Sequence, residues 1–139
     1  MNYRAKVSTI MTTNLITMSP DATLEEAQQM FRKHHLHHIP IVEGKKLVGM
    51  ISSTDLAHYI HDYHRNEKEV EQDAKRLQNT HVGDIMITGL GKLEPDDRIN
   101  VAIEVFKINL FHALPVVENG DLVGILTTHD FFKIMSEES

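Results

Sequence analysis

Two short segments pair a hydroxyl with a carboxylate three residues later, directly after an apolar run. They read LVGMISSTD, which ends at Asp55, and LVGILTTHD, which ends at Asp130. Ser52 and Thr127 supply the two hydroxyls. Both pairs fit the capping-box pattern, in which a hydroxyl and a carboxylate satisfy free backbone N–H groups at the start of a helix.

The same groups could also bind a ligand. A helix N-terminus attracts anions, and a hydroxyl there can bond a phosphate. A carboxylate can accept two hydrogen bonds, one from each hydroxyl of a ribose. Gly49 and Gly124 precede the two motifs, and a glycine there leaves room for a ligand to approach the backbone. Local chemistry leaves both interpretations open.

The motif occurs twice because the chain is an internal repeat. Val7–Ile60 aligns with Val82–Met135 without a gap, and roughly a third of the aligned positions are identical, several times what residue frequencies alone give. Each copy is near the lower size limit for an independent core. We therefore expect one module of two halves that share one core about a pseudo-two-fold axis, with the first repeat and a helical extension in residues 1–78 and the second repeat in residues 79–139.

Each copy begins with a short extended segment, Leu15–Met18 or Leu90–Leu93, and continues into a helix. Thr23 and Glu26 form a capping box at the start of the first helix. Apolar residues at helical spacing follow in both copies. They are Leu24, Ala27, Met30 and Phe31 in the first and Ile99, Ala102, Phe106 and Leu110 in the second.

The runs IPIVE and LPVVE predict buried strands, and each leads through a tight turn into a second strand. Asn119-Gly120 favours a type I′ turn, and Gly44-Lys45 suits type II′. A helix then begins near Ser53 or Thr128. The predicted fold is therefore of the mixed α/β (α+β) class, with the order β-α-β-β-α occurring twice.

Between the copies lies HDYHRNEKEVEQDAKRLQNT, which has no glycine or proline and many good helix formers. We expect it to extend the last helix of the first copy. Its polar face is interpreted most simply as solvated.

Composition excludes several functions. The 139 residues carry a formal charge of −6, which disfavours non-specific binding of nucleic acid. The chain has no cysteine, no signal-like N-terminus and no apolar run long enough to span a bilayer. We expect a cytoplasmic protein that contacts neither nucleic acid nor membrane.

The run IMTTNLITMSPDATLEEAQQMFRKHHLHHIPIVEGKKLVGMISSTDL resembles a CBS domain, and so does DIMITGLGKLEPDDRINVAIEVFKINLFHALPVVENGDLVGILTTHDF. The resemblance rests on I-M-T, S-P-D, H-x-x-P followed by a hydrophobic residue and Val, L-V-G, and the ending G-x-x-S/T-x-x-D. Two such repeats in tandem are called a CBS pair or Bateman module.

The resemblance implies that adenosine compounds bind in clefts between the repeats as regulatory ligands. AMP, ADP, ATP and S-adenosylmethionine are the usual ones, and no other cofactor is expected. The aspartate of each motif would hold the ribose, and the Ser or Thr would face phosphate. The implied ligand-binding residues are Thr12, Leu15, Ile16, His37, Pro40, Ser52, Thr54 and Asp55 from the first half, and Thr88, Leu90, His112, Pro115, Thr127, His129 and Asp130 from the second.

In the family a basic residue before the H-x-x-P strand often contacts phosphate, and His37 and His112 fill that position. Because imidazole is largely neutral at pH 7, we expect a monophosphate or nucleoside-like ligand. The segments Thr12–Ile16 and Ile87–Gly91 would hold adenine and reach the motif of the other repeat. The second repeat has Gly91 at the position where the first has the apolar Ile16. This difference predicts that the two sites bind the ligand with unequal affinities.

The resemblance also implies a homodimer and regulation of an unknown target protein, with the chain acting as a stand-alone sensor. No P-loop or nucleophile elbow is present, so we predict no enzyme and no catalytic residues. An alternative is a dimerisation or scaffold module whose motifs only cap helices.

A second alternative is a metal sensor, because ten histidines are an unusually large number. His58, His61 and His64 have helical spacing, and imidazoles together with a carboxylate suit zinc. A role for the histidines in sensing pH is also open.

Overall fold

The structure is a computed structural model that describes residues 1–60, 67–109 and 112–138. The chain forms two compact units. Unit 1 contains Met1–Leu15, Lys45–Leu47 and Gly89–Ser139. Unit 2 contains Ile16–Gly44 and Val48–Thr88.

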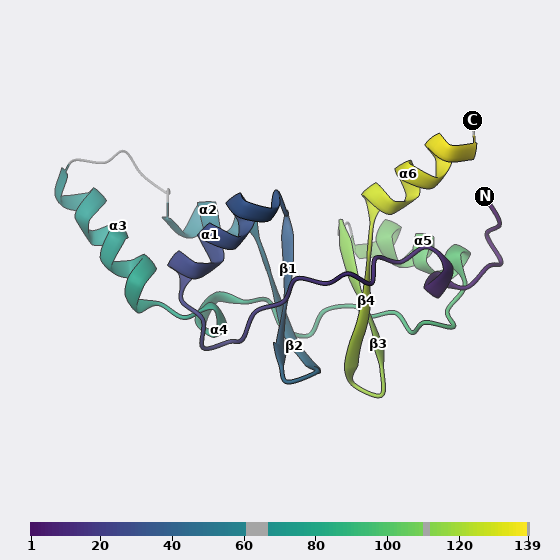
Figure 1. Cartoon of the computed structure of the whole chain (residues 1–139), viewed down its shortest axis with the longest axis horizontal. Coiled ribbons are helices and arrows are strands. Elements are labelled where there is room, and N and C mark those ends of the chain that lie inside the picture. The colour runs from purple at the N-terminus through teal and green to yellow at the C-terminus, as the bar shows by residue number, and fades with distance from the viewer. Residues whose placement is uncertain (61–66, 110–111, 139) are drawn as a thin grey trace. The chain divides into compact units, whose positions relative to one another are not determined.

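Unit 2 holds most of the elements of the first repeat (Figure 1). They are α1 (Leu24–His34), β1 (His38–Glu43), β2 (Lys46–Ser52, whose first two residues belong to unit 1), α2 (Ser53–Ile60) and α3 (Glu67–Asn79). Unit 2 also holds α4 (Val82–Ile85), from the start of the second repeat. β1 and β2 are neighbours in the sheet. α1 contacts both α2 and α3.

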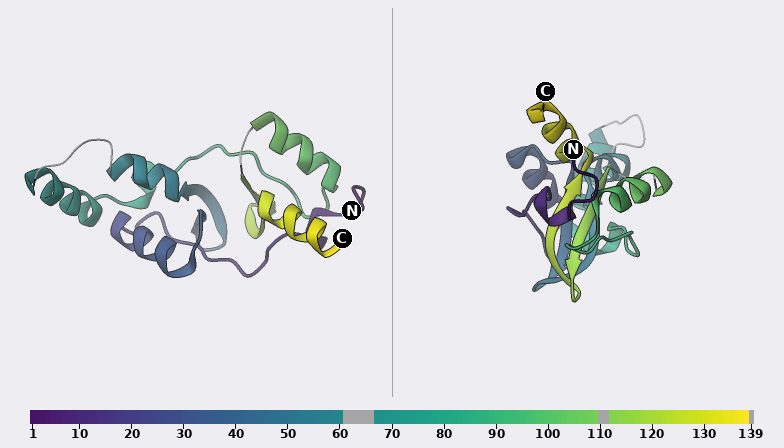
Figure 2. Two further views of the ribbon diagram at one scale, coloured as in Figure 1. Left: turned by 90° about the horizontal axis from the view of Figure 1, so that it is seen from above. Right: turned by 90° about the vertical axis from the view of Figure 1, so that its right-hand side faces the viewer.

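Unit 1 holds the elements of the second repeat, and Figure 2 shows its strands and helices from two further directions. They are α5 (Ile99–Asn109), β3 (Ala113–Glu118), β4 (Asp121–Thr127) and α6 (Thr128–Glu138). Unit 1 also holds the 3-10 helix η1 (Val7–Thr9), from the start of the first repeat. β3 and β4 pair antiparallel, with an irregularity between Val116 and Val117. Lys46 at the start of β2 pairs antiparallel with Asp121 of β4.

Each unit is completed by a segment from the start of the other repeat. In unit 1, Val7 N–H donates to the carbonyl of Asp97 at 2.7 Å, and Ile99 N–H donates to that of Ala5 at 3.0 Å. In unit 2, Val82 N–H donates to the carbonyl of Ala22 at 2.7 Å. The repeat boundary predicted at residue 78 therefore does not coincide with the boundary between the compact units.

Buried apolar side chains form a cluster within each unit. Each cluster includes one residue of the contributed segment, Val7 or Val82, and both are 0% exposed. The unit 2 cluster contains Met18, Leu24, Ala27, Phe31, Ile39, Ile41, Ile51, Leu56, Ile60 and Val82. The unit 1 cluster contains Val7, Leu93, Ala102, Leu114, Val116 and Leu126.

The first long helix begins where its sequence predicts. The Thr23 hydroxyl accepts a hydrogen bond from Glu26 N–H at 3.2 Å, and the Glu26 carboxylate accepts one from Thr23 N–H at 3.4 Å. Both halves of the capping box are therefore present. The helix ends at His34, and the following residue, His35, is a left-handed C-cap with a φ of 52°.

Both hairpin turns have the predicted geometry. Asn119 and Gly120 have φ values of 54° and 85°, as a type I′ turn requires. In the other hairpin only Gly44 has a positive φ, at 61°, as in type II′.

The early extended segments form isolated bridges instead of full strands: Met18 pairs with Ile41, and Leu93 with Val116, both in parallel. The predicted inter-repeat helix is present as α3. Its predicted continuity with α2 falls on residues 61–66, outside the described residues. Each helix in the described part of the chain is too short or too polar to cross a bilayer.

Candidate functional site

Asp130, in the first turn of α6, is the one buried charged residue among the described residues, at 9% exposure. Its Oδ2 accepts hydrogen bonds from the Thr127 N–H at 2.8 Å and from the Thr127 hydroxyl at 3.2 Å. Its Oδ1 accepts one from the Thr12 hydroxyl at 3.0 Å. Three donors therefore hold this carboxylate.

Thr127 and Asp130 also form the capping box that the sequence predicts. The Asp130 N–H lies 3.3 Å from the Thr127 hydroxyl oxygen, and the Asp130 carboxylate accepts from the Thr127 N–H in return. A ligand that binds the Asp130 carboxylate must therefore either replace one of these hydrogen bonds or use acceptor capacity that they leave free.

The corresponding pair in unit 2, Ser52 and Asp55, has fewer hydrogen bonds. Asp55 N–H donates to the Ser52 hydroxyl oxygen at 3.0 Å, which is one half of a capping box. The Asp55 carboxylate is half-buried and accepts no hydrogen bond from a residue that the structure describes. Among the described residues, this carboxylate therefore keeps its capacity to accept hydrogen bonds.

The early segments do reach the motif of the other repeat, as predicted. Thr12 and Ile125 exchange backbone hydrogen bonds of 2.9 and 3.0 Å in unit 1. Ile87 and Met50 exchange bonds of 2.8 and 3.0 Å in unit 2. Each candidate site thus combines a segment from one repeat with the strand and helix start of the other.

The role predicted for the two glycines is wrong in its detail. A Cβ at Gly124 would lie 2.5 Å from Sδ of Met11, and a Cβ at Gly49 would lie 2.6 Å from Sδ of Met86. The space that each glycine leaves is therefore filled by a methionine side chain, not kept open for a ligand. The sequence did carry this signal, because the pair Ile-Met begins both copies at equivalent positions.

The predicted prolines and histidines contribute backbone contacts. The buried Pro40 accepts a hydrogen bond from Met18 N–H at 3.2 Å. Its equivalent, Pro115, accepts one from Leu93 N–H at 2.9 Å. The prolines therefore fix the early segments against β1 and β3.

His37 and His112 connect each strand to the following helix. The carbonyl of His37 accepts from Ser53 N–H at 2.9 Å, and that of His112 from Thr128 N–H at 3.1 Å. Both imidazoles are exposed, so their predicted contact with a phosphate stays a prediction.

The remaining predicted residues divide between the two units. Thr54 and His129 are exposed in the first turns of α2 and α6. Thr88 is exposed, whereas Leu15, Ile16 and Leu90 are half-buried. Leu15 and Leu90 belong to unit 1, and Ile16 and Thr88 to unit 2.

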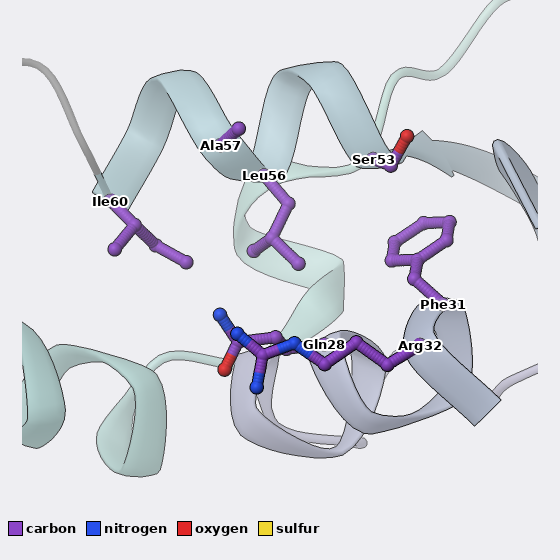
Figure 3. Close-up of a pocket in the computed structure, with 7 residues that line it drawn as sticks. All are labelled: Gln28, Phe31, Arg32, Ser53, Leu56, Ala57 and Ile60. Atoms are coloured by element: carbon purple, nitrogen blue, oxygen red, sulfur yellow. The ribbon is translucent and has the colours of Figure 1, made fainter. Parts of the chain in front are cut away.

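Two hollows are formed by described residues of unit 2, and neither of these two is lined by Asp55. The first, of about 150 Å³, separates α1 from α2 (Figure 3), where Leu56 and Ile60 face Gln28, Phe31 and Arg32. The second, of about 450 Å³, is wide open and is lined by Ser53, Thr54, Ala57 and His58. Of the predicted ligand residues, Thr54 alone lines one of these hollows.

The predicted metal ligands cannot be placed together. His58 is exposed, whereas His61 and His64 lie outside the described residues. Within the described ranges, no group of three His, Cys, Asp or Glu side chains is arranged to hold a metal ion.

A profile of the CBS domain matches residues 7–62 and 82–137. The chain is 30% identical over 137 residues to the CBS domain-containing protein YhcV of Bacillus subtilis, which covers 97% of this chain and 89% of that protein. It is 27% identical over 130 residues to the inosine-5′-monophosphate dehydrogenase of Methanocaldococcus jannaschii, and spans 23% of that protein.

Solved structures show the same fold. CBSX2 in complex with AMP matches with a TM-score of 0.78 at 22% identity, covering 96% of this chain and 97% of that one. The CBS domain pair of MJ0100, in complex with 5′-methylthioadenosine and S-adenosylmethionine, matches with a TM-score of 0.76 at 24% identity, covering 97% and 98%. The chain therefore belongs to the CBS domain family and carries two copies of the domain.

Proposed function

We propose that the chain is a regulatory module that binds adenosine-type compounds at its two Ser/Thr-x-x-Asp motifs and signals their occupancy to a partner protein. The observation that carries the proposal is the half-buried Asp55, whose carboxylate accepts no hydrogen bond from the described residues. A carboxylate withdrawn from water needs donors, and the two hydroxyls of a ribose supply them.

Related structures support the same class of ligand. CBSX2 binds AMP, and the MJ0100 pair binds 5′-methylthioadenosine and S-adenosylmethionine. What these ligands share is adenosine or a close derivative, so we place the adenosine part at the aspartate motifs. Histidines, His37 and His112, stand where a permanently charged arginine would favour a triphosphate, so we propose a monophosphate or nucleoside-like ligand.

Signalling then follows from linkage. A ligand shifts the protein toward whichever arrangement binds it better, and a partner that recognises that arrangement responds. A homodimer and a separate target protein are part of this proposal. Light scattering during size-exclusion chromatography tests the dimer, with and without AMP.

Calorimetry with AMP, ATP and S-adenosylmethionine tests the ligand. We expect AMP to bind more tightly than ATP, and we expect Asp55→Asn and Asp130→Asn each to weaken one site. Asparagine keeps the side-chain shape while replacing one acceptor oxygen by a donor. Glu94→Gln, a neutralisation at an exposed residue outside both motifs, is the matched control. If the double variant bound AMP as the unmodified protein does, the assignment would be wrong.

The complete capping box of Thr127 and Asp130 favours a second candidate, a scaffold module whose motifs only cap helices. Thermal unfolding separates the two candidates. A ligand at 100 times its Kd stabilises the folded state by about 2.7 kcal/mol, whereas a scaffold without a ligand site shows no shift with any adenosine compound.

A further inference from the structure

The two aspartates differ in how many hydrogen bonds they can still accept. Each carboxylate oxygen has room for about two donors. On Asp130, Oδ2 already accepts from the Thr127 N–H and hydroxyl, and Oδ1 accepts from Thr12. A ribose diol that uses both oxygens therefore meets a crowded carboxylate.

The Asp55 carboxylate has more free capacity to accept hydrogen bonds. Its carboxylate accepts no hydrogen bond from the described residues. The position equivalent to Thr12 in the repeat is Ile87, which has no hydroxyl to donate. The backbones match, because Thr12 pairs with Ile125 as Ile87 pairs with Met50. The difference at Oδ1 therefore comes from one side chain, whereas the Thr127 N–H and hydroxyl account for the difference at Oδ2.

We propose that Thr12 is an internal competitor for Asp130, its hydroxyl standing where a ribose hydroxyl of the ligand would bind. The two sites then fill in order: the Asp55 site first, and the Asp130 site only after Thr12 turns away. This inference rests on the proposed function and adds to it a regulatory residue.

Displacing Thr12 needs no change of the main chain. Thr12 is exposed, so its hydroxyl can turn into water. Its backbone bonds to Ile125, of 2.9 and 3.0 Å, do not involve that hydroxyl. The competition therefore costs the ligand one hydrogen bond to a charged acceptor, which corresponds to about a tenfold loss of affinity.

The test compares AMP affinities at one site at a time by calorimetry. In the Asp55→Asn background, which leaves the Asp130 site, Thr12→Val should tighten AMP about tenfold. In the Asp130→Asn background, Ile87→Thr should weaken AMP by a similar factor. Thr9→Val is the matched control, because Thr9 is on the same segment and its hydroxyl donates to the Lys6 carbonyl at 2.7 Å, away from the site.

A second probe separates competition for the ribose from a general effect. The affinity of 2′,3′-dideoxy-AMP should not change with Thr12→Val, because this compound has no hydroxyl to place on Asp130. Unligated Thr12→Val should also unfold at a slightly lower temperature, having lost a bond, and yet gain a larger thermal shift from AMP.

The outcomes are distinguishable. If AMP binds the unmodified protein and Thr12→Val leaves its affinity unchanged or weaker, then Thr12 holds Asp130 ready for the ligand and the competition is refuted, while the proposed function stands. If neither protein binds AMP, both proposals fail.

Discussion

Replacing Gly124 by alanine tests how the early segment is held at the Asp130 site. An added Cβ would lie 2.5 Å from Sδ, 2.9 Å from Cγ and 3.2 Å from Cε of Met11. All three contacts are with one side chain, and Met11 directly precedes Thr12. The substitution therefore pushes on the segment that carries the hydroxyl bound to Asp130.

Two opposing effects set the change in the free energy of unfolding that Gly124→Ala causes. Gly124 has no positive φ, so alanine fits the backbone and gains about 0.4–1 kcal/mol by restricting the unfolded chain. Overpacking a filled interior costs about 1–3 kcal/mol. We therefore expect Gly124→Ala to lower the free energy of unfolding by about 0.5–2 kcal/mol.

A double-mutant cycle isolates the contact. Met11→Ala removes the atoms that oppose the new methyl group, so the two substitutions together should be less destabilising than their sum, by about 0.5–3 kcal/mol. At Gly49 the added Cβ would meet Met86 Sδ at 2.6 Å and also the backbone oxygen of Ile87 at 3.0 Å. Met86→Ala should therefore relieve Gly49→Ala only in part.

Equilibrium unfolding in urea measures these free energies, and hydrogen exchange assigns each loss to its unit. If Gly124→Ala were as stable as the unmodified protein, or if Met11→Ala gave no relief, the close contact of Met11 with Gly124 would be refuted.

Two further substitutions test local features. Thr23→Ala removes the hydroxyl that caps α1 and should cost about 1 kcal/mol in urea unfolding; an unchanged midpoint would show that the cap contributes nothing. Gly120→Ala should cost about 1–2 kcal/mol for its φ of 85°, plus the displacement of Lys46 Nζ, 3.1 Å from the new Cβ. Gly44→Ala is the matched control, with a φ of 61° and nothing within 4 Å, and equal losses at the two turns would contradict a role for Lys46.

Local features were predictable from the sequence because they depend on residues close together in the chain. The capping box at Thr23 and the turns at Gly44 and Asn119-Gly120 are set by short-range sterics and hydrogen bonds. The repeat alignment likewise predicted the equivalent strands and helices. The resemblance to CBS domains then indicated which segments meet, including the approach of Thr12 to the second motif.

The sequence pattern did not predict the contacts between segments that are far apart in the chain. The pattern did not predict that Val7 and Val82 each complete a buried cluster composed mainly of residues from the other repeat. The methionines beside Gly49 and Gly124 show that a glycine can make room for the chain itself. The unequal carboxylates arise in part from Thr12 and Ile87, whose difference matters only once the fold brings them to a strand of the other repeat. The rest arises from Thr127, whose N–H and hydroxyl both donate to Asp130.

A crystal structure of the protein with AMP tests the central claim most directly. We predict ribose hydroxyls on the carboxylate of Asp55, and at the second site a ribose on Asp130 with the Thr12 hydroxyl turned away from it. AMP bound elsewhere, such as in the hollow between α1 and α2, with both aspartates left to their helix caps, would contradict the account.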